Sequence, residues 1–114
     1  MHTRGIPVTT INSLRNYLRH GISPGDGIKA VLSGELYNAA RRLDGDNWAA
    51  LRELIQFVQC HMPIASYGDR RAIAEWIDSA QLRRDCAFQI SEAMRELDEL
   101  EEATTGSPKK SAVQ

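Results

Sequence analysis

Apolar positions along most of the chain recur at intervals of three and four residues, the spacing of an amphipathic helix. Strict alternation of apolar and polar residues, which marks a half-buried strand, is nearly absent. In the first predicted helix, which Thr9 or Thr10 caps, Ile11, Leu14 and Leu18 share one face. The pattern predicts an all-α protein, a compact bundle of four to five short helices followed by a longer acidic C-terminal helix and a disordered tail.

Glycine and proline divide the first half of this pattern into short pieces. Gly21 is expected to end the first helix in the left-handed conformation, with Ile22 folding back on the last turn. Ser23 and Pro24 are then expected as the N-cap and the first position of a second helix. Gly34 breaks or kinks that helix, because glycine in a helix interior costs about 1 kcal/mol.

The strongest helical signal follows a turn at residues 44–46, where either aspartate can cap the helix. Its apolar stripe includes Trp48, and Pro63 ends it. Asp69 is the expected cap of the next helix, whose apolar face includes Trp76. Because both tryptophans lie on apolar stripes, we expect both in the core.

From residue 82 the apolar stripe becomes narrower, with steps of four and three residues that approach a heptad repeat. The positions that define this self-association seam are Cys86, Ile90, Leu97 and Leu100. A helix with such a seam must cover it by folding back on the bundle, by pairing with a second copy, or by docking in a partner's groove. The fold-back and the self-pairing are the favoured alternatives.

Charge distinguishes between parallel and antiparallel self-pairing. Six of the 15 acidic residues lie within residues 92–102, although the whole chain carries a net charge of only −1. These acids would repel their copies in a parallel pair, whereas an antiparallel pair brings them toward Arg83 and Arg84 of the other copy. The pattern therefore predicts an antiparallel homodimer through residues 82–102.

These patterns divide the 114 residues, which suit a single domain, into four parts. They are an N-terminal arm (1–8), a helical bundle (9–80), an acidic C-terminal helix (81–102) and a disordered tail (103–114). The arm lacks the apolar run of a signal peptide, and no segment approaches the ~18 apolar residues of a membrane span. A soluble, cytoplasmic protein that does not interact with a membrane is expected.

Arginine supplies 11 of the 14 basic residues, and it suits planar, bidentate contacts with anionic groups. The candidate partner-binding residues are Tyr67, Arg70, Arg71, Arg83 and Arg84. Two of these arginines begin a helix, where their charge opposes the helix dipole, and Arg71 with Glu75 forms an i,i+4 pair that offsets this. Tyr67, Arg70 and Arg71 either form an exposed patch for a carboxylate- or phosphate-rich partner or lie on an ordinary solvated face, which is the favoured alternative.

Patterns typical of catalysis or metal binding are missing from the sequence. Cys60 and His61 are adjacent, so on a helix their side chains lie about 100° apart and do not easily face one ion. There is no nucleophile elbow, glycine-rich phosphate loop or carboxylate pair with a histidine partner. We expect no catalytic residue, no metal site and no cofactor.

Residues 6–77 resemble a family of small helical proteins encoded by proteobacterial phages and prophages. The matching residues are His20-Gly21-Ile22, Pro24-Gly25, Ala30-Val31-Leu32-Ser33, Leu36, Ala39, Asp44, Asn47, Ala50-Leu51, Pro63, Gly68 and Trp76-Ile77. The chain departs from the family at residues 67–70, which are Tyr-Gly-Asp-Arg where such proteins have Trp-Gly-Ser-Pro. The resemblance implies a helical fold and a phage-associated origin, and it carries over no catalytic residue.

The expected function is that of a non-enzymatic phage or prophage accessory protein in the bacterial host cytoplasm. It would dock on a host macromolecular machine, either a protein or a protein–nucleic-acid complex. The most specific form of this hypothesis is an anti-CRISPR-like inhibitor. One alternative is a helical nucleic-acid-binding protein that uses the arginine pairs, although the near-zero net charge counts against direct nucleic-acid binding. The other is a component of virion assembly.

Overall fold

The computed structural model describes residues 5–43 and 45–105, which form helices and loops with no strand among them. The helices are α1 (Val8–His20), α2 (Asp26–Ser33), α3 (Leu36–Arg42), α4 (Gly45–Ala49), α5 (Leu51–His61), the 3-10 helix η1 (Ile64–Ser66), α6 (Arg70–Asp78), α7 (Ala80–Asp85) and α8 (Ala87–Thr105). The predicted all-α fold with a long C-terminal helix is confirmed. Residues 103–105, predicted as part of the tail, belong to α8, and the rest of the predicted tail lies outside the described residues.

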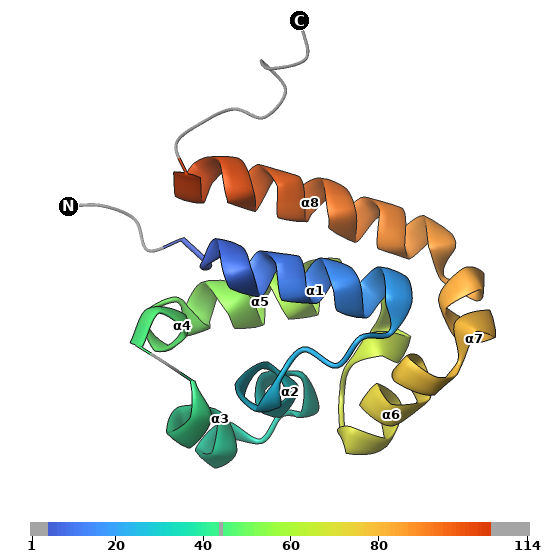
Figure 1. The fold of residues 1–114 in the computed structure, drawn as a ribbon, viewed down its shortest axis with the longest axis horizontal. Coiled ribbons are helices and arrows are strands. Elements are labelled where there is room, and N and C mark those ends of the chain that lie inside the picture. The colour runs from blue at the N-terminus through green and yellow to red at the C-terminus, as the bar shows by residue number, and fades with distance from the viewer. Residues whose placement is uncertain (1–4, 44, 106–114) are drawn as a thin grey trace, which may run out of the picture.

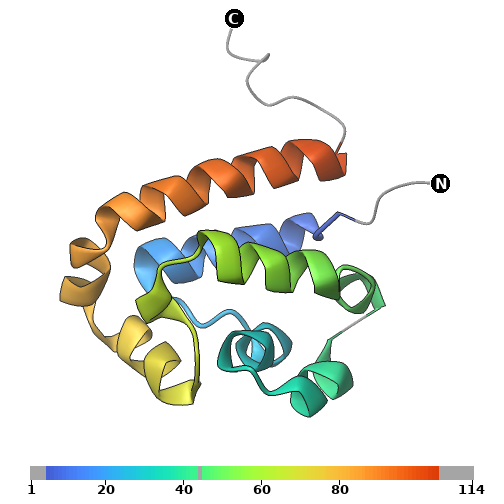
Figure 2. The same cartoon turned by 180° about the vertical axis from the view of Figure 1, so that it is seen from behind.

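The long helix α8 forms one side of the molecule and lies antiparallel to α1 along its length (Figure 1). The reverse view shows α5 lying in front of α1 and beneath α8 (Figure 2). Helix α8 contacts both α1 and α5, while α2 contacts α3 and α6 on the other side of the molecule. Among the described helices, none is both long and apolar enough to cross a bilayer.

Helix α1 supplies the centre of the core. Four of its side chains, at the helical spacing of positions 11, 14, 17 and 18, are fully buried. Tyr17 is among them, and its hydroxyl donates to the backbone carbonyl of Ser66 at 2.7 Å. The indole Nε1 of Trp76 donates to the backbone carbonyl of Tyr17 at 2.9 Å. The core thus satisfies the polar atoms of its two largest side chains, as burial requires.

Two predicted glycine positions are confirmed at helix ends. Gly21 follows α1 with a φ of 67°, and its N–H donates to the carbonyl of Tyr17 at 3.0 Å. Gly34 follows α2 with a φ of 78°, so α2 and α3 are separate helices. Only glycine adopts this left-handed backbone without appreciable strain.

The helix starts are predicted less well than the helix ends. Asp69 caps α6 as expected, because its side chain accepts the N–H of Ala72 at 2.8 Å. The predicted threonine cap of α1 is wrong: the helix begins at Val8, and the hydroxyl of Thr10 instead donates to Asn47 at 2.6 Å. The predicted start of α2 at residues 23–24 is also wrong, since that helix begins at Asp26.

The prediction that Trp48 lies in the core is wrong, because its side chain is 50% exposed. The chain leaves helical geometry at Ala50, where φ is −100° and ψ is 14°. This break separates α4 from α5, so Trp48 does not continue the apolar stripe of α5. Trp76, by contrast, is fully buried as predicted.

The seam of the acidic helix is covered by the chain itself. Leu97 is fully buried, and Cys86, Ile90 and Leu100 are half-buried against the same core. The acidic helix therefore folds back on the bundle, which is one of the two favoured alternatives. The fully buried Leu97 is unavailable to a second copy. The dimer through residues 82–102 remains a prediction without an exposed apolar seam to support it.

The structure of residues 81–102 differs in two further respects from the predicted acidic helix. Its predicted span from residue 81 is interrupted at Cys86, which separates α7 from α8. The guanidinium of Arg15 in α1 contacts Asp98 at 2.5 Å and Glu101 at 2.7 Å. Part of the acidic charge is therefore neutralised within the chain rather than by a second copy.

Candidate binding groove

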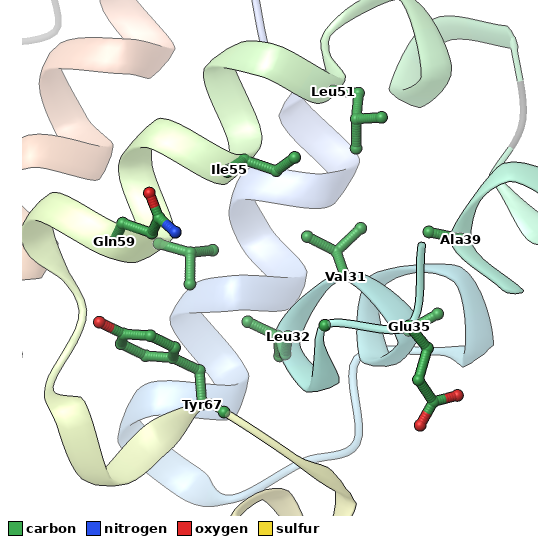
Figure 3. Close-up of a pocket in the computed structure, with 12 residues that line it drawn as sticks. Val31, Leu32, Glu35, Ala39, Leu51, Ile55, Gln59 and Tyr67 are labelled. Carbon is green, nitrogen blue, oxygen red and sulfur yellow. The ribbon is translucent and has the colours of Figure 1, made fainter. Parts of the chain in front are cut away.

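An open apolar groove of about 350 Å³ lies between α2, α3, α5 and the loop that follows η1 (Figure 3). Its lining residues are Ala30, Val31, Leu32, Gly34, Glu35, Ala39, Leu51, Ile55, Val58, Gln59, Tyr67 and Gly68. This volume lies at the lower end of the ~300–1,000 Å³ that is typical of ligand pockets. We name this site the α2–α5 groove.

The walls of the α2–α5 groove are apolar side chains that the flanking helices do not fully bury against each other. Val31 of α2 and Leu51 of α5 are half-buried, and Ile55 is 37% exposed. Ile55 and Leu51 lie four residues apart, so they share one face of α5 and point toward α2 (Figure 3). Together with Val58, these two side chains form the α5 wall of the groove.

The loop carrying Tyr67 closes one end of the groove. Its position is fixed by the N–H of Gly68, which donates to the carbonyl of Leu32 at 2.8 Å. Tyr67 is half-buried, and in the close-up its ring and the amide of Gln59 lie at the same end of the groove (Figure 3). Neither side chain forms a hydrogen bond with another described residue, so the phenol and the amide both have unused hydrogen-bonding groups here.

An ion pair stands at the rim of the groove. The guanidinium of Arg70 donates to the two carboxylate oxygens of Glu35, from Nε at 2.7 Å and from Nη2 at 2.9 Å. Asn38 donates to the same carboxylate at 2.7 Å. These hydrogen bonds, Arg70 first, lower the pKa of Glu35 to about 2, so the pair stays ionised at neutral pH.

The five predicted partner-binding residues do not form one patch. Tyr67 lines the α2–α5 groove and Arg70 lies at its rim. Arg71 points to solvent, with its side chain 87% exposed, and forms the predicted pair with Glu75 at 3.4 Å.

The other two predicted residues lie on α7, away from this groove. Arg83 donates to the backbone carbonyls of Trp76 and Ile77, so it caps the C-terminal end of α6. Arg84 is exposed and donates to Gln81 at 2.9 Å. All four arginines form hydrogen bonds or ion pairs with groups of the chain itself. Of the five predicted residues, the structure brings Tyr67 and Arg70 together at the groove.

Apolar spacing alone would place the groove's wall residues in the core. Ile55 and Val31 lie on apolar stripes, and a stripe alone does not reveal which of its members lack a covering element. The available signal was the width of the α5 stripe, because Ile55 lies at its edge. Gln59, one turn further along α5, gave no signal at all.

In the described part of the chain, the side chains do not assemble a site for metal or thiol chemistry. No group of three or more histidine, cysteine, aspartate or glutamate side chains is placed there to hold a metal ion. Cys60 is exposed and Cys86 is half-buried. Burial, followed by the charge of Asp85, raises the pKa of the Cys86 thiol, which disfavours the reactive thiolate.

No protein-family model matches the chain, and no match was found among curated proteins or solved structures. By its fold and its site, the chain is an all-α protein with an open apolar groove.

Proposed function

We propose that this protein is a non-enzymatic binding protein that docks on another protein through the α2–α5 groove. The observation that carries the proposal is the open apolar wall of this groove, with Ile55 37% exposed in a concavity of about 350 Å³. Exposed apolar side chains in a concave site are the usual anchors of protein recognition.

The chemistry of the groove favours a peptide segment as its occupant. The apolar walls suit one or two large apolar side chains of the partner. At the end of the groove, the free amide of Gln59 and the free hydroxyl of Tyr67 can each donate to and accept from a peptide backbone. The charge of Glu35 is already neutralised by Arg70, so the groove requires no charged group from the partner.

The resemblance to small phage and prophage proteins suggests where such a partner belongs. A phage-encoded binding protein would dock on a macromolecular machine of its bacterial host, and a host-defence complex is one such machine. In this proposal an anti-CRISPR-like inhibitor would occupy a surface of the complex through the α2–α5 groove. It would need no catalytic residue, metal or cofactor.

Selection from a random peptide display library tests the groove without a known partner. Wild-type protein should enrich peptides that share a large apolar residue. Ile55→Glu should weaken their binding about tenfold or more, because it places a charge on the apolar wall. Tyr67→Phe should weaken binding less, since it removes a single hydrogen-bonding hydroxyl.

Ile64→Glu is the matched control, because Ile64 is 83% exposed and does not line the groove. It makes the same substitution and should leave peptide binding unchanged. Enrichment of no peptide, or equal loss of binding in Ile55→Glu and Ile64→Glu, would overturn the proposal. Thermal melting of each variant establishes that the fold is retained.

A further inference from the structure

A second concavity, of about 370 Å³, lies where the end of α1 meets α7 and the start of α8. It shares no lining residue with the α2–α5 groove. Three arginines and one serine supply its polar groups, namely Arg19 of α1, Arg83 and Arg84 of α7, and Ser91 of α8. Among the described residues, no acidic side chain lines it. We name this site the arginine pocket; Figure 1 shows the junction of α6, α7 and α8 beside the end of α1.

The arginine pocket contrasts with the contact between α1 and α8 one helical turn away. There, Arg15 is neutralised by Asp98 and Glu101. Arg19, four residues later on the same face of α1, meets the part of α8 that carries Ser91 and Met94 instead. Among the described residues, no acid pairs with Arg19 as Asp98 and Glu101 pair with Arg15.

Two of the three guanidinium groups are available to a ligand. Arg19 forms no hydrogen bond or ion pair with any described residue, and it is exposed. Arg84 donates to the neutral amide of Gln81 and forms no ion pair within the described chain. Arg83 is held by the carbonyls at the end of α6, so it contributes positive charge but not a free donor.

We propose that the arginine pocket binds a phosphate group carried by a small ligand. A phosphate has three oxygens and up to two negative charges, so it can accept from guanidinium groups on two walls and from the Ser91 hydroxyl together. A carboxylate has two oxygens that one arginine satisfies. Like charges gathered in a concavity also raise the local concentration of an anion.

Titration with inorganic pyrophosphate at low ionic strength, followed by amide chemical shifts, tests this proposal. Residues of α1, α7 and α8 around the pocket should shift and saturate. Arg19→Gln and Arg84→Gln should each weaken binding about tenfold or more, because each removes a charge-assisted hydrogen bond. Arg71→Gln is the matched control, since it removes the same charge from an exposed residue outside the pocket. It should bind pyrophosphate as the wild type does.

Three comparison ligands define the ligand class. Citrate, a tricarboxylate, should bind more weakly than pyrophosphate. Adenosine diphosphate, if it binds more tightly than pyrophosphate, identifies the phosphate as that of a nucleotide, and equal affinity identifies a site for the phosphate alone. Duplex DNA that binds more tightly than either, and loses binding in Arg19→Gln, would overturn the proposal in favour of a nucleic-acid backbone.

Other outcomes would also overturn it. These are the absence of saturable pyrophosphate binding, binding of citrate as tight as that of pyrophosphate, and an equal loss of binding in Arg71→Gln and in the pocket variants. Failure here would leave the α2–α5 groove untouched, because the two sites share no residue.

Discussion

The guanidinium of Arg83 occupies the space that a side chain on Gly21 would need. A Cβ built on Gly21 would also lie 2.8 Å from the carbonyl oxygen of Ile77, one of the two carbonyls to which Arg83 donates. The last turn of α1, the end of α6 and the side chain of Arg83 therefore meet at a residue that must be small. Gly21 is required for its missing side chain as well as for its left-handed backbone.

Gly21→Ala should therefore destabilise the protein by more than backbone strain alone. The left-handed conformation costs an L-residue about 1–2 kcal/mol, and displacement of Arg83 from its carbonyls adds to this. Gly34→Ala is the control, because Gly34 has a similar φ of 78° but a Cβ added there would have room. The nearest atom to that Cβ would be the carbonyl oxygen of Gly68, at 3.8 Å. Urea unfolding should show a larger loss for Gly21→Ala. Equal losses would show that Arg83 moves aside without cost.

The buried hydroxyl of Tyr17 is expected to stabilise the fold. Tyr17→Phe leaves the carbonyl of Ser66 without its donor in a fully buried position, which should cost about 1–3 kcal/mol. Tyr37→Phe, at a residue that is 85% exposed, should leave the free energy of unfolding unchanged. Denaturant unfolding of both variants measures the difference. An unchanged Tyr17→Phe would mean that the carbonyl finds another donor.

The ion pair at the groove rim should be visible in an acid titration. The hydrogen bonds from Arg70, the largest cause, and from Asn38 lower the pKa of Glu35 from 4.5 to about 2 in the folded protein. A lowered folded-state pKa means that the pair stabilises the folded state above about pH 4.5, and that this contribution is lost as the pH falls toward 2. In Arg70→Gln the pKa should rise toward 4.5, as carboxyl chemical shifts would report.

Arg71→Gln serves as the control for that titration, because Arg71 pairs with Glu75 and not with Glu35. It should leave the pKa of Glu35 where it is in the wild type. A wild-type Glu35 that titrates near 4.5 would contradict the ion pair itself.

Because the seam of α8 is covered by the chain's own core, we expect Leu97 to stabilise the fold. Leu97→Ala should cost about 2–5 kcal/mol, because it opens a cavity beneath a fully buried side chain. Phe88→Ala, on the same helix at a residue that is 74% exposed, should have little effect. In sedimentation, both the wild type and the less stable Leu97→Asp should be monomers. A wild-type dimer that Leu97→Asp dissociates would restore the prediction of self-pairing.

Local features of the sequence determined the helices and several of their ends. The spacing of apolar residues predicted the all-α class, and Gly21, Gly34 and Asp69 act where their backbone or capping chemistry predicted. These features are readable because an apolar stripe, a left-handed glycine and an aspartate cap each act within a few residues of chain.

Only the tertiary structure decided which helices cover which faces. The apolar spacing of the α8 seam suits a second copy and the chain's own core equally well. In the structure, α8 packs on α1 and α5, so the seam faces the chain's own core. Packing likewise left Ile55 uncovered beside α2, and it brought Arg70 to Glu35, 35 residues away. Burial and ion pairing between distant segments depend on how whole helices are placed, and the spacing within one helix carries no information on its neighbours.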